Sequence, residues 1–142
     1  MPKNTNRCIA PFTQLTIDPV GNTSPCPYLG GMTWQFDKDS TVQKRWTGEE
    51  FEDLRKSHIN NERDERCQRC WNEEDAGKQS LRKRLYTDFA LDIDKIDQSI
   101  EDKSYLKGPI TLTMKNGNVC NLQCRSCGPK DSMAWLPEAK HY

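Results

Sequence analysis

The first apolar pattern along the chain is that of a β-hairpin. Phe12, Leu15 and Ile17 lie among Thr and Gln, and the stretch IDPVGN contains Pro19 and Gly21, which favour a turn. We therefore expect a β-hairpin over about residues 12 to 28. Residues 29 to 46 contain two glycines and no regular period, which predicts a loop.

Two helices are predicted in the middle of the chain. Thr47 is followed three positions later by Glu50, which is a capping-box pattern, and this first helix should end at Asn60 and Asn61. His58 lies within it, where we expect a partly packed surface residue and not a ligand. The second helix should run from about residue 71 to 86, with Leu81 and Leu85 as its apolar pair.

In the C-terminal third of the chain, the sequence pattern predicts a helix, a strand and one helical turn. Between residues 87 and 107, apolar residues recur at a helical spacing among many acidic residues, which indicates a short helix. Ile110, Leu112 and Met114 alternate with threonines, which is typical of a strand. That strand leads directly into a loop rich in cysteine. Asp131 or Ser132 can then cap one turn of helix before Pro137. The expected fold class is α+β.

Composition limits what this chain can be. Its 142 residues suffice for one ordinary domain, or for a small domain with part of a second. Hydrophobic residues make up 34% and charged residues 30%, so the apolar core must be thin. Lys and Arg together number 21, as do Asp and Glu, so no net charge attracts nucleic acid or an anionic membrane. The chain has no 18-residue apolar run and no apolar leader, so we expect no membrane partner.

Cysteine is the residue type that points to chemistry. Seven cysteines in 142 residues are fewer than a secreted disulfide scaffold usually carries. We therefore expect a cytoplasmic chain whose thiols bind metal, because disulfides are rare in that reducing compartment. The odd number also suits a division into four and three better than complete pairing.

Three of the cysteines lie in the loop NVCNLQCRSCGP, as Cys120, Cys124 and Cys127 in a C-x3-C-x2-C spacing. Clustered thiolates favour zinc or an iron–sulfur cluster. A structural zinc ion would need a fourth ligand from elsewhere, because its shell is closed and tetrahedral. A 4Fe–4S cluster can instead be held at three irons, with the fourth iron open. Both readings are compatible with the spacing.

The other four cysteines form a second set. Cys8 and Cys26 enclose twelve residues, Gly21 and four more residues, and Cys67 and Cys70 follow in CQRCW. Four thiolates can close the shell of a 4Fe–4S cluster or bind one zinc ion. A zinc ribbon usually has two short C-x2–4-C knuckles, and the segment between Cys8 and Cys26 is too long to be one.

The strand ITLTM followed by CNLQC and CRSC resembles the start of the radical S-adenosylmethionine superfamily. The resemblance implies that Cys120, Cys124 and Cys127 hold a 4Fe–4S cluster whose open iron binds S-adenosylmethionine. Reduction of the bound sulfonium then gives a 5′-deoxyadenosyl radical, which abstracts hydrogen from a substrate. Members of the family usually carry an aromatic residue before the third cysteine. This chain has Ser126 there, which could contact the adenine only through its backbone.

The spacing of Cys8, Gly21 and Cys26 resembles the opening of the SPASM and twitch domains, which are auxiliary modules of many radical S-adenosylmethionine enzymes. That resemblance implies a second 4Fe–4S cluster on Cys8, Cys26, Cys67 and Cys70, in the shorter twitch form. It implies two parts, residues 1–107 for the auxiliary domain and residues 108–142 for the first βα element of a barrel. In most members the auxiliary module follows the barrel, and here it comes first.

The resulting functional hypothesis is an iron–sulfur protein for S-adenosylmethionine-dependent radical chemistry. Because residues 110–142 supply only one strand, its loop and the start of a helix, we expect the chain alone to be inactive, and no catalytic side chain is assigned. Its expected partners are a reducing electron donor, a substrate that by family analogy is a peptide, and a second chain that completes the barrel. The alternative is a small binding module stabilised by zinc.

Overall fold

The computed structural model describes residues 6–19, 21–29, 39, 41–115, 117–129 and 131–139, and the backbone of residues 34–35. Short helices and strands alternate along this part of the chain. In order they are α1 (Ala10–Thr13), β1 (Gln14–Ile17), β2 (Asn22–Ser24), β3 (Trp34–Gln35), α2 (Val42–Trp46), α3 (Glu49–Ile59), η1 (Glu65–Cys67), α4 (Gln68–Asp75), α5 (Leu81–Asp88), α6 (Ile93–Glu101), η2 (Ser104–Lys107), β4 (Thr111–Met114), η3 (Met133–Trp135) and α7 (Leu136–Ala139), where η marks a 3-10 helix.

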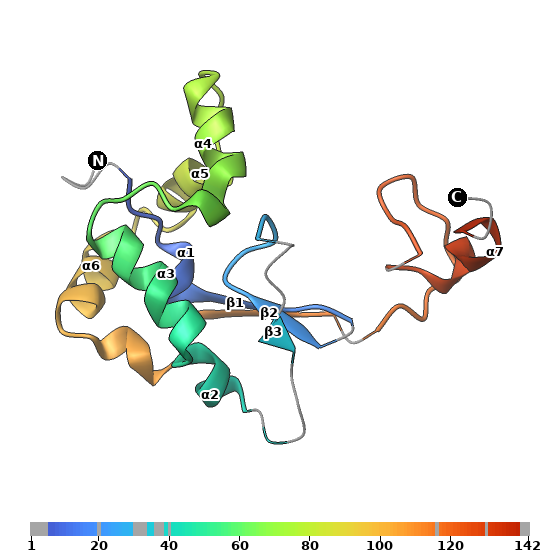
Figure 1. Cartoon of the computed structure of the whole chain (residues 1–142), viewed down its shortest axis with the longest axis horizontal. Helices are drawn as coiled ribbons and strands as arrows, with labels where there is room; N and C mark the ends of the chain where they lie inside the picture. The colour runs from blue at the N-terminus through green and yellow to red at the C-terminus, as the bar shows by residue number, and fades with distance from the viewer. Residues whose placement is uncertain are drawn as a thin grey trace.

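The strands form one small mixed sheet in the order β3-β2-β1-β4 (Figure 1). The predicted hairpin is confirmed as the antiparallel pair β1 and β2. Its turn is closed by Asp18, whose side chain accepts the backbone N–H of Asn22 at 2.8 Å, and by Gly21 at a φ of 85°, a conformation that suits glycine. The hairpin begins later than we expected. Phe12 lies in the helix α1, whose first turn contains Pro11 and whose Thr13 hydroxyl donates to the carbonyl of Ile9.

β4 confirms the strand that the alternation around Leu112 predicted. It pairs with β1 in parallel, with Leu112 opposite Leu15. The expected boundary between residues 107 and 108 thus falls directly before a strand that joins the sheet of the N-terminal hairpin. Beyond β4, the segment that ends in α7 lies at the far end of the sheet from α5 and α6 (Figure 1).

The helices between the hairpin and β4 differ from the prediction at their ends. Residues 29 to 46 are not all loop, because they contain β3 and the helix α2, which is capped by the Thr41 side chain. The first predicted helix begins at Glu49 with Gly48 as its N-cap, and not with Thr47. Thr47 belongs to the end of α2, because its hydroxyl donates to the carbonyl of Gln43.

The second predicted helix is in fact two helices. α4 ends at Asp75, Gly77 takes a φ of 73°, and Ser80 caps the start of α5. The short acidic helix is confirmed as α6. The helical turn near the C-terminus is capped by Ser132, as one of the two predicted alternatives stated, but it continues through Pro137 as α7. Proline is tolerated there because the first turn of a helix needs no N–H from it.

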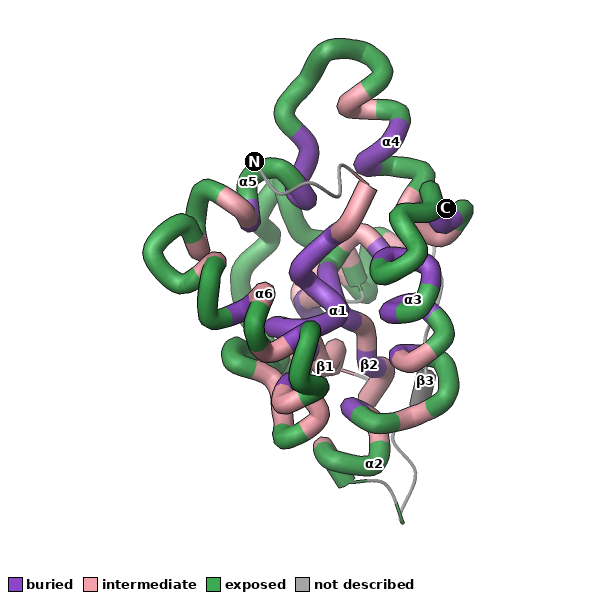
Figure 2. The backbone as a smooth tube through the Cα atoms, turned by 90° about the vertical axis from the view of Figure 1, so that its left-hand side faces the viewer, coloured by how far each residue is buried: buried purple, intermediate pink, exposed green. Residues whose placement is uncertain are grey.

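The core is formed where α1 meets α3, α6 and the hairpin. α1 is buried along its whole length and lies centrally among the helices (Figure 2). Trp46, with no exposed surface, donates its indole N–H to the carbonyl of Tyr105 at 2.6 Å and thereby fixes η2 to α2. The fully buried Arg55 of α3 stacks 4.4 Å from the Trp46 ring and donates to the carbonyls of Pro11 and Trp46.

The α+β class is confirmed, with a small sheet and short helices around a thin core of two hydrophobic clusters. No helix in the described part of the chain has the length and apolar character that crossing a membrane requires.

Candidate metal centre

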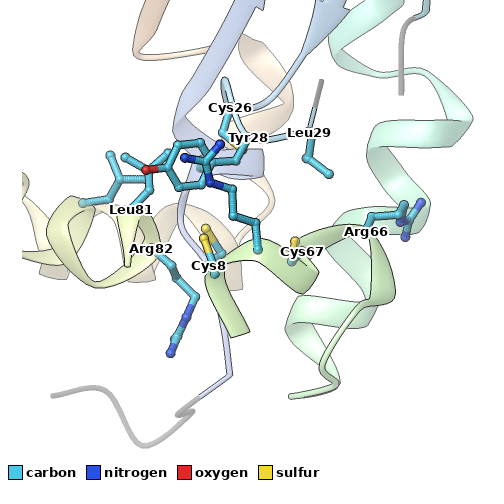
Figure 3. Close-up of a pocket in the computed structure, with 12 residues that line it drawn as sticks. Cys8, Cys26, Tyr28, Leu29, Arg66, Cys67, Leu81 and Arg82 are labelled. Carbon is cyan, nitrogen blue, oxygen red and sulfur yellow. The ribbon is translucent and has the colours of Figure 1, made fainter. Parts of the chain in front are cut away.

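Four cysteines from three separate segments line one pocket beside α1. Cys8 precedes α1, Cys26 follows β2, Cys67 ends η1, and Cys70 lies in α4 (Figure 3). They are the four cysteines that the sequence grouped into one set. The remaining lining residues are Ala10, Tyr28, Leu29, Arg66, Arg69, Leu81, Arg82 and Leu85.

Local hydrogen bonds present each cysteine to this pocket. After β2, the hydroxyl of Ser24 donates to the Cys26 carbonyl at 3.0 Å, and the same carbonyl accepts the backbone N–H of Leu29. Asp64 starts η1 by accepting the backbone N–H of Arg66 at 2.9 Å, and its carbonyl accepts the N–H of Cys67. η1 continues directly into α4, so Cys67 and Cys70 stand one helical turn apart.

Burial makes these thiols hard to ionise by themselves. It raises the pKa of Cys67 to about 12, and it also raises the pKa of Cys8, Cys26 and Cys70. The negative charges that the thiols would carry repel one another in each of the six possible pairs, because all four cysteines line the same pocket. A cationic metal group in the pocket would offset both effects, since thiolate is the form that binds metal.

Three of the four sulfurs already receive hydrogen bonds that favour thiolate. A backbone hydrogen bond from Ala10 lowers the pKa of Cys8, those from Tyr28 and Leu29 lower that of Cys26, and one from Arg82 lowers that of Cys70, each against the larger effect of burial. Helix and turn N–H groups therefore surround the sulfurs, as in sites for anionic ligands.

The donor set is all sulfur, which fits an iron–sulfur cluster or zinc. In the described ranges, no group of three or more His, Cys, Asp or Glu side chains has the arrangement of a site for a single metal ion.

His58 is a residue of this site that the sequence analysis missed. It has no exposed surface, and its Nε2 lies 3.7 Å from the sulfur of Cys67. Burial lowers its pKa to about 4, so the imidazole is neutral at neutral pH. Its place on the same stripe of α3 as Leu54 was a signal for burial, but only the fold shows that it reaches Cys67.

A buried ion pair supports the far wall of the pocket. Arg82, at the start of α5, pairs with Glu74 of α4, and each side chain is 8% exposed. Arg82 and Ser80 donate hydrogen bonds to Glu74 and lower its pKa, although burial alone would raise it. The pair joins α4, which carries Cys70, to α5.

The three-cysteine loop is organised differently. Cys120, Cys124 and Cys127 are all exposed free thiols, and the N–H of Cys127 donates to the carbonyl of Cys124 at 3.0 Å. The buried hydroxyl of Ser132 holds the loop through the carbonyls of Cys120 and Leu122, at 3.0 and 2.7 Å. Ser126 is exposed at the tip between the second and third cysteine.

Residues 8–71 match the family model of the SPASM iron–sulfur cluster-binding domain. The match contains all four cysteines of the pocket and indicates that this segment binds an iron–sulfur cluster; the three-cysteine loop lies outside it. No curated protein matches the chain, and no solved structure does.

Proposed function

We propose that the chain is an iron–sulfur protein of the radical S-adenosylmethionine type with an auxiliary cluster module at its N-terminus. The observation that carries the proposal is the pocket in which Cys8, Cys26, Cys67 and Cys70 meet, inside the segment that matches a cluster-binding domain. These four thiolates would hold a 4Fe–4S cluster with every iron ligated, which suits electron transfer or a structural role.

Cys120, Cys124 and Cys127 would hold the second 4Fe–4S cluster. The support for this is their C-x3-C-x2-C spacing, their common exposure on a loop that follows a parallel strand, and the anchoring of that loop by Ser132. Such a cluster supplies, when bound, an open iron for S-adenosylmethionine and the electron that cleaves it. The protein would contribute placement through its loop, with the backbone of Ser126 beside the adenine.

The reaction of the whole protein would be hydrogen abstraction from a substrate, by analogy a peptide, with a reducing electron donor in the cytoplasm. Further barrel strands, from more chain or from a second chain, would cover β4. In support, seven of the nine exposed large apolar side chains in the described ranges lie between Ile110 and Leu136. Without such a cover, the segment from Ile110 to Leu136 would bury too little apolar surface to exclude water from a radical.

Anaerobic purification followed by assays of iron, sulfide and zinc tests the proposal. Two clusters predict about eight irons with matching sulfide per chain. Cys70→Ser and Cys124→Ser should each remove roughly half of the iron if the sites are independent. Ser126→Ala, in the same loop, is the control and should retain all of it. Stoichiometric zinc in a colourless protein would overturn the proposal in favour of a zinc-stabilised binding module, and loss of all iron in either variant would show one shared site.

The role of the loop in binding S-adenosylmethionine has a separate test. Addition of S-adenosylmethionine to the reduced protein should change the electron paramagnetic resonance spectrum of the cluster on Cys120, Cys124 and Cys127. That change should persist in Cys70→Ser and vanish in Cys124→Ser. A spectrum that S-adenosylmethionine leaves unchanged in the wild-type protein would contradict this part of the proposal.

A further inference from the structure

The pocket of the four cysteines opens to solvent where its lining residues are exposed. Most of its lining side chains are buried, whereas Tyr28, Arg66 and Cys67 are partly exposed and Arg69 is exposed. Arg66 is held by two carboxylates, with Asp64 at 2.5 Å and Asp53 at 2.9 Å. Its guanidinium points away from Cys8 (Figure 3). The opening is therefore bordered mainly by Tyr28 and Arg69.

Arg69 and Tyr28 are in direct contact across that opening. The Arg69 guanidinium lies 3.8 Å from the centre of the Tyr28 ring, which is close for a cation–π stack. Arg69 occupies α4 between Cys67 and Cys70, and Tyr28 follows Cys26. The stack thus joins the two cysteine-bearing segments on the solvent side. A weak exposed pair with Glu73, at 3.5 Å, orients the Arg69 side chain along α4.

We propose that Arg69 and Tyr28 form a cap over the cluster pocket, which limits solvent access to the cluster and sets its reduction potential. This inference rests on the proposed function, because it concerns the cluster held by Cys8, Cys26, Cys67 and Cys70. Neither residue is a ligand. They act on the cluster through its environment, since solvent exposure and nearby charge are among the factors that set the potential of an iron–sulfur centre.

Two variants of Arg69 separate the cover from the charge. Arg69→Ala removes both, whereas Arg69→Lys keeps the positive charge but loses the flat guanidinium that stacks on the ring. On the other side of the stack, Tyr28→Leu removes the ring and Tyr28→Phe preserves it. Arg84→Ala is the matched control, because Arg84 is equally exposed, also pairs with a carboxylate four residues on, and does not line the pocket.

The experiment measures two properties of the purified cluster-loaded chain: the rate at which an iron chelator extracts iron, and the reduction potential. We make the measurements in a Cys124→Ser background, so that the signal comes from the four-cysteine site. Arg69→Ala, Arg69→Lys and Tyr28→Leu should release iron about two- to five-fold faster, the factor expected for an exposed cation–π contact. Tyr28→Phe and Arg84→Ala should release it at the parent rate.

The potential should be lower in Arg69→Ala than in Arg69→Lys, because loss of the cation disfavours the more negative reduced cluster. Iron release at the parent rate in all variants, with equal potentials in the two Arg69 variants, would overturn the cap while leaving cluster binding intact. A parent protein that holds no iron at the four cysteines would overturn the proposed function and the cap together.

Discussion

At the scale of single residues, the seven cysteines differ sharply in exposure, and their reactivity should differ accordingly. Cys120, Cys124 and Cys127 are exposed, whereas Cys8, Cys26 and Cys70 are buried and the pKa of Cys67 is raised to about 12 by burial. Alkylation requires thiolate. We expect iodoacetamide at pH 8 to modify the three loop cysteines quickly and Cys67 roughly three orders of magnitude more slowly than an ordinary thiol.

Peptide mass spectrometry over a time course measures this difference. In urea, all seven cysteines should react at similar rates, which serves as the control for access. Raising the pH should speed the reaction of Cys67, because the thiolate of a group with a high pKa becomes populated only as pH approaches that value. Equal labelling of the two sets in the folded metal-free protein would contradict the buried pocket.

Arg55 is the residue on which the packing of α3 depends most. It is fully buried, donates to the carbonyls of Pro11 and Trp46, and stacks on the rings of Trp46 and Tyr105. Arg55→Leu leaves two buried carbonyls without these donors, so we expect a loss of about 2–4 kcal/mol in the free energy of unfolding. Urea denaturation measures it. The half-exposed Arg63, which stacks on Trp71, is the control, and an equal loss in Arg63→Leu would contradict the assignment.

Sequence reasoning can group residues where local spacing carries the information. The spacing of the cysteines can be read directly from the sequence, and it grouped Cys8, Cys26, Cys67 and Cys70 into one set. The structure brings these four together in one pocket. Tyr28 and Arg69 line the same pocket and meet across segments far apart in the sequence, and His58 contacts Cys67, nine residues further on. No local pattern of charge or hydrophobicity encodes such contacts, so these three residues could not be assigned to the site in advance.

At the scale of elements, the connection between α4 and α5 decides how the pocket is closed. Our single predicted helix missed the break because we followed the spacing of Leu81 and Leu85 and gave no weight to Gly77 and Ser80, which are ordinary stop and start signals. The break lets α5 turn back so that Arg82 meets Glu74 in the interior. The connection therefore relies on a buried ion pair.

Because the connection between α4 and α5 relies on this ion pair, a single substitution in the pair should lower the stability of the protein strongly. Glu74→Gln removes one charge of the pair and leaves Arg82 without its carboxylate, which typically costs about 3–5 kcal/mol for a buried pair. We expect a clear fall in the melting temperature and weaker retention of iron, since α4 carries Cys70. Asp75→Asn makes the same chemical change in the next residue, whose pair with Arg63 is exposed, and should leave the melting temperature nearly unchanged. Similar losses in both variants would show that the buried pair has no special role.

At the scale of the whole molecule, the parallel pairing of β1 with β4 links the two parts of the chain. The strand β4 was predicted from its alternation, but its partner was not, because pairing between residues almost 100 positions apart leaves no local pattern. The pairing makes the auxiliary hairpin and the strand before the three-cysteine loop members of one sheet. The two proposed cluster sites are therefore carried by a common framework.

The same strand pair shows that the buried part of the sheet ends between β1 and the edge strand β4, because residues opposite each other on paired strands point to the same face. Leu15 of β1 has no exposed surface, whereas Leu112, directly opposite it on β4, is 47% exposed. Leu15→Ala should cost about 2–5 kcal/mol of unfolding free energy, because it leaves a cavity. Leu112→Ala should cost less than about 0.5 kcal/mol, as is usual for a surface substitution. Urea denaturation of the two variants compares the same chemical change on neighbouring strands.

If further barrel strands cover β4 in the functional protein, Leu112→Ala should weaken activity or assembly there while leaving this chain stable. A loss as large as that of Leu15→Ala in this chain would instead make Leu112 part of its own core and remove the support that β4 gives to a covering partner.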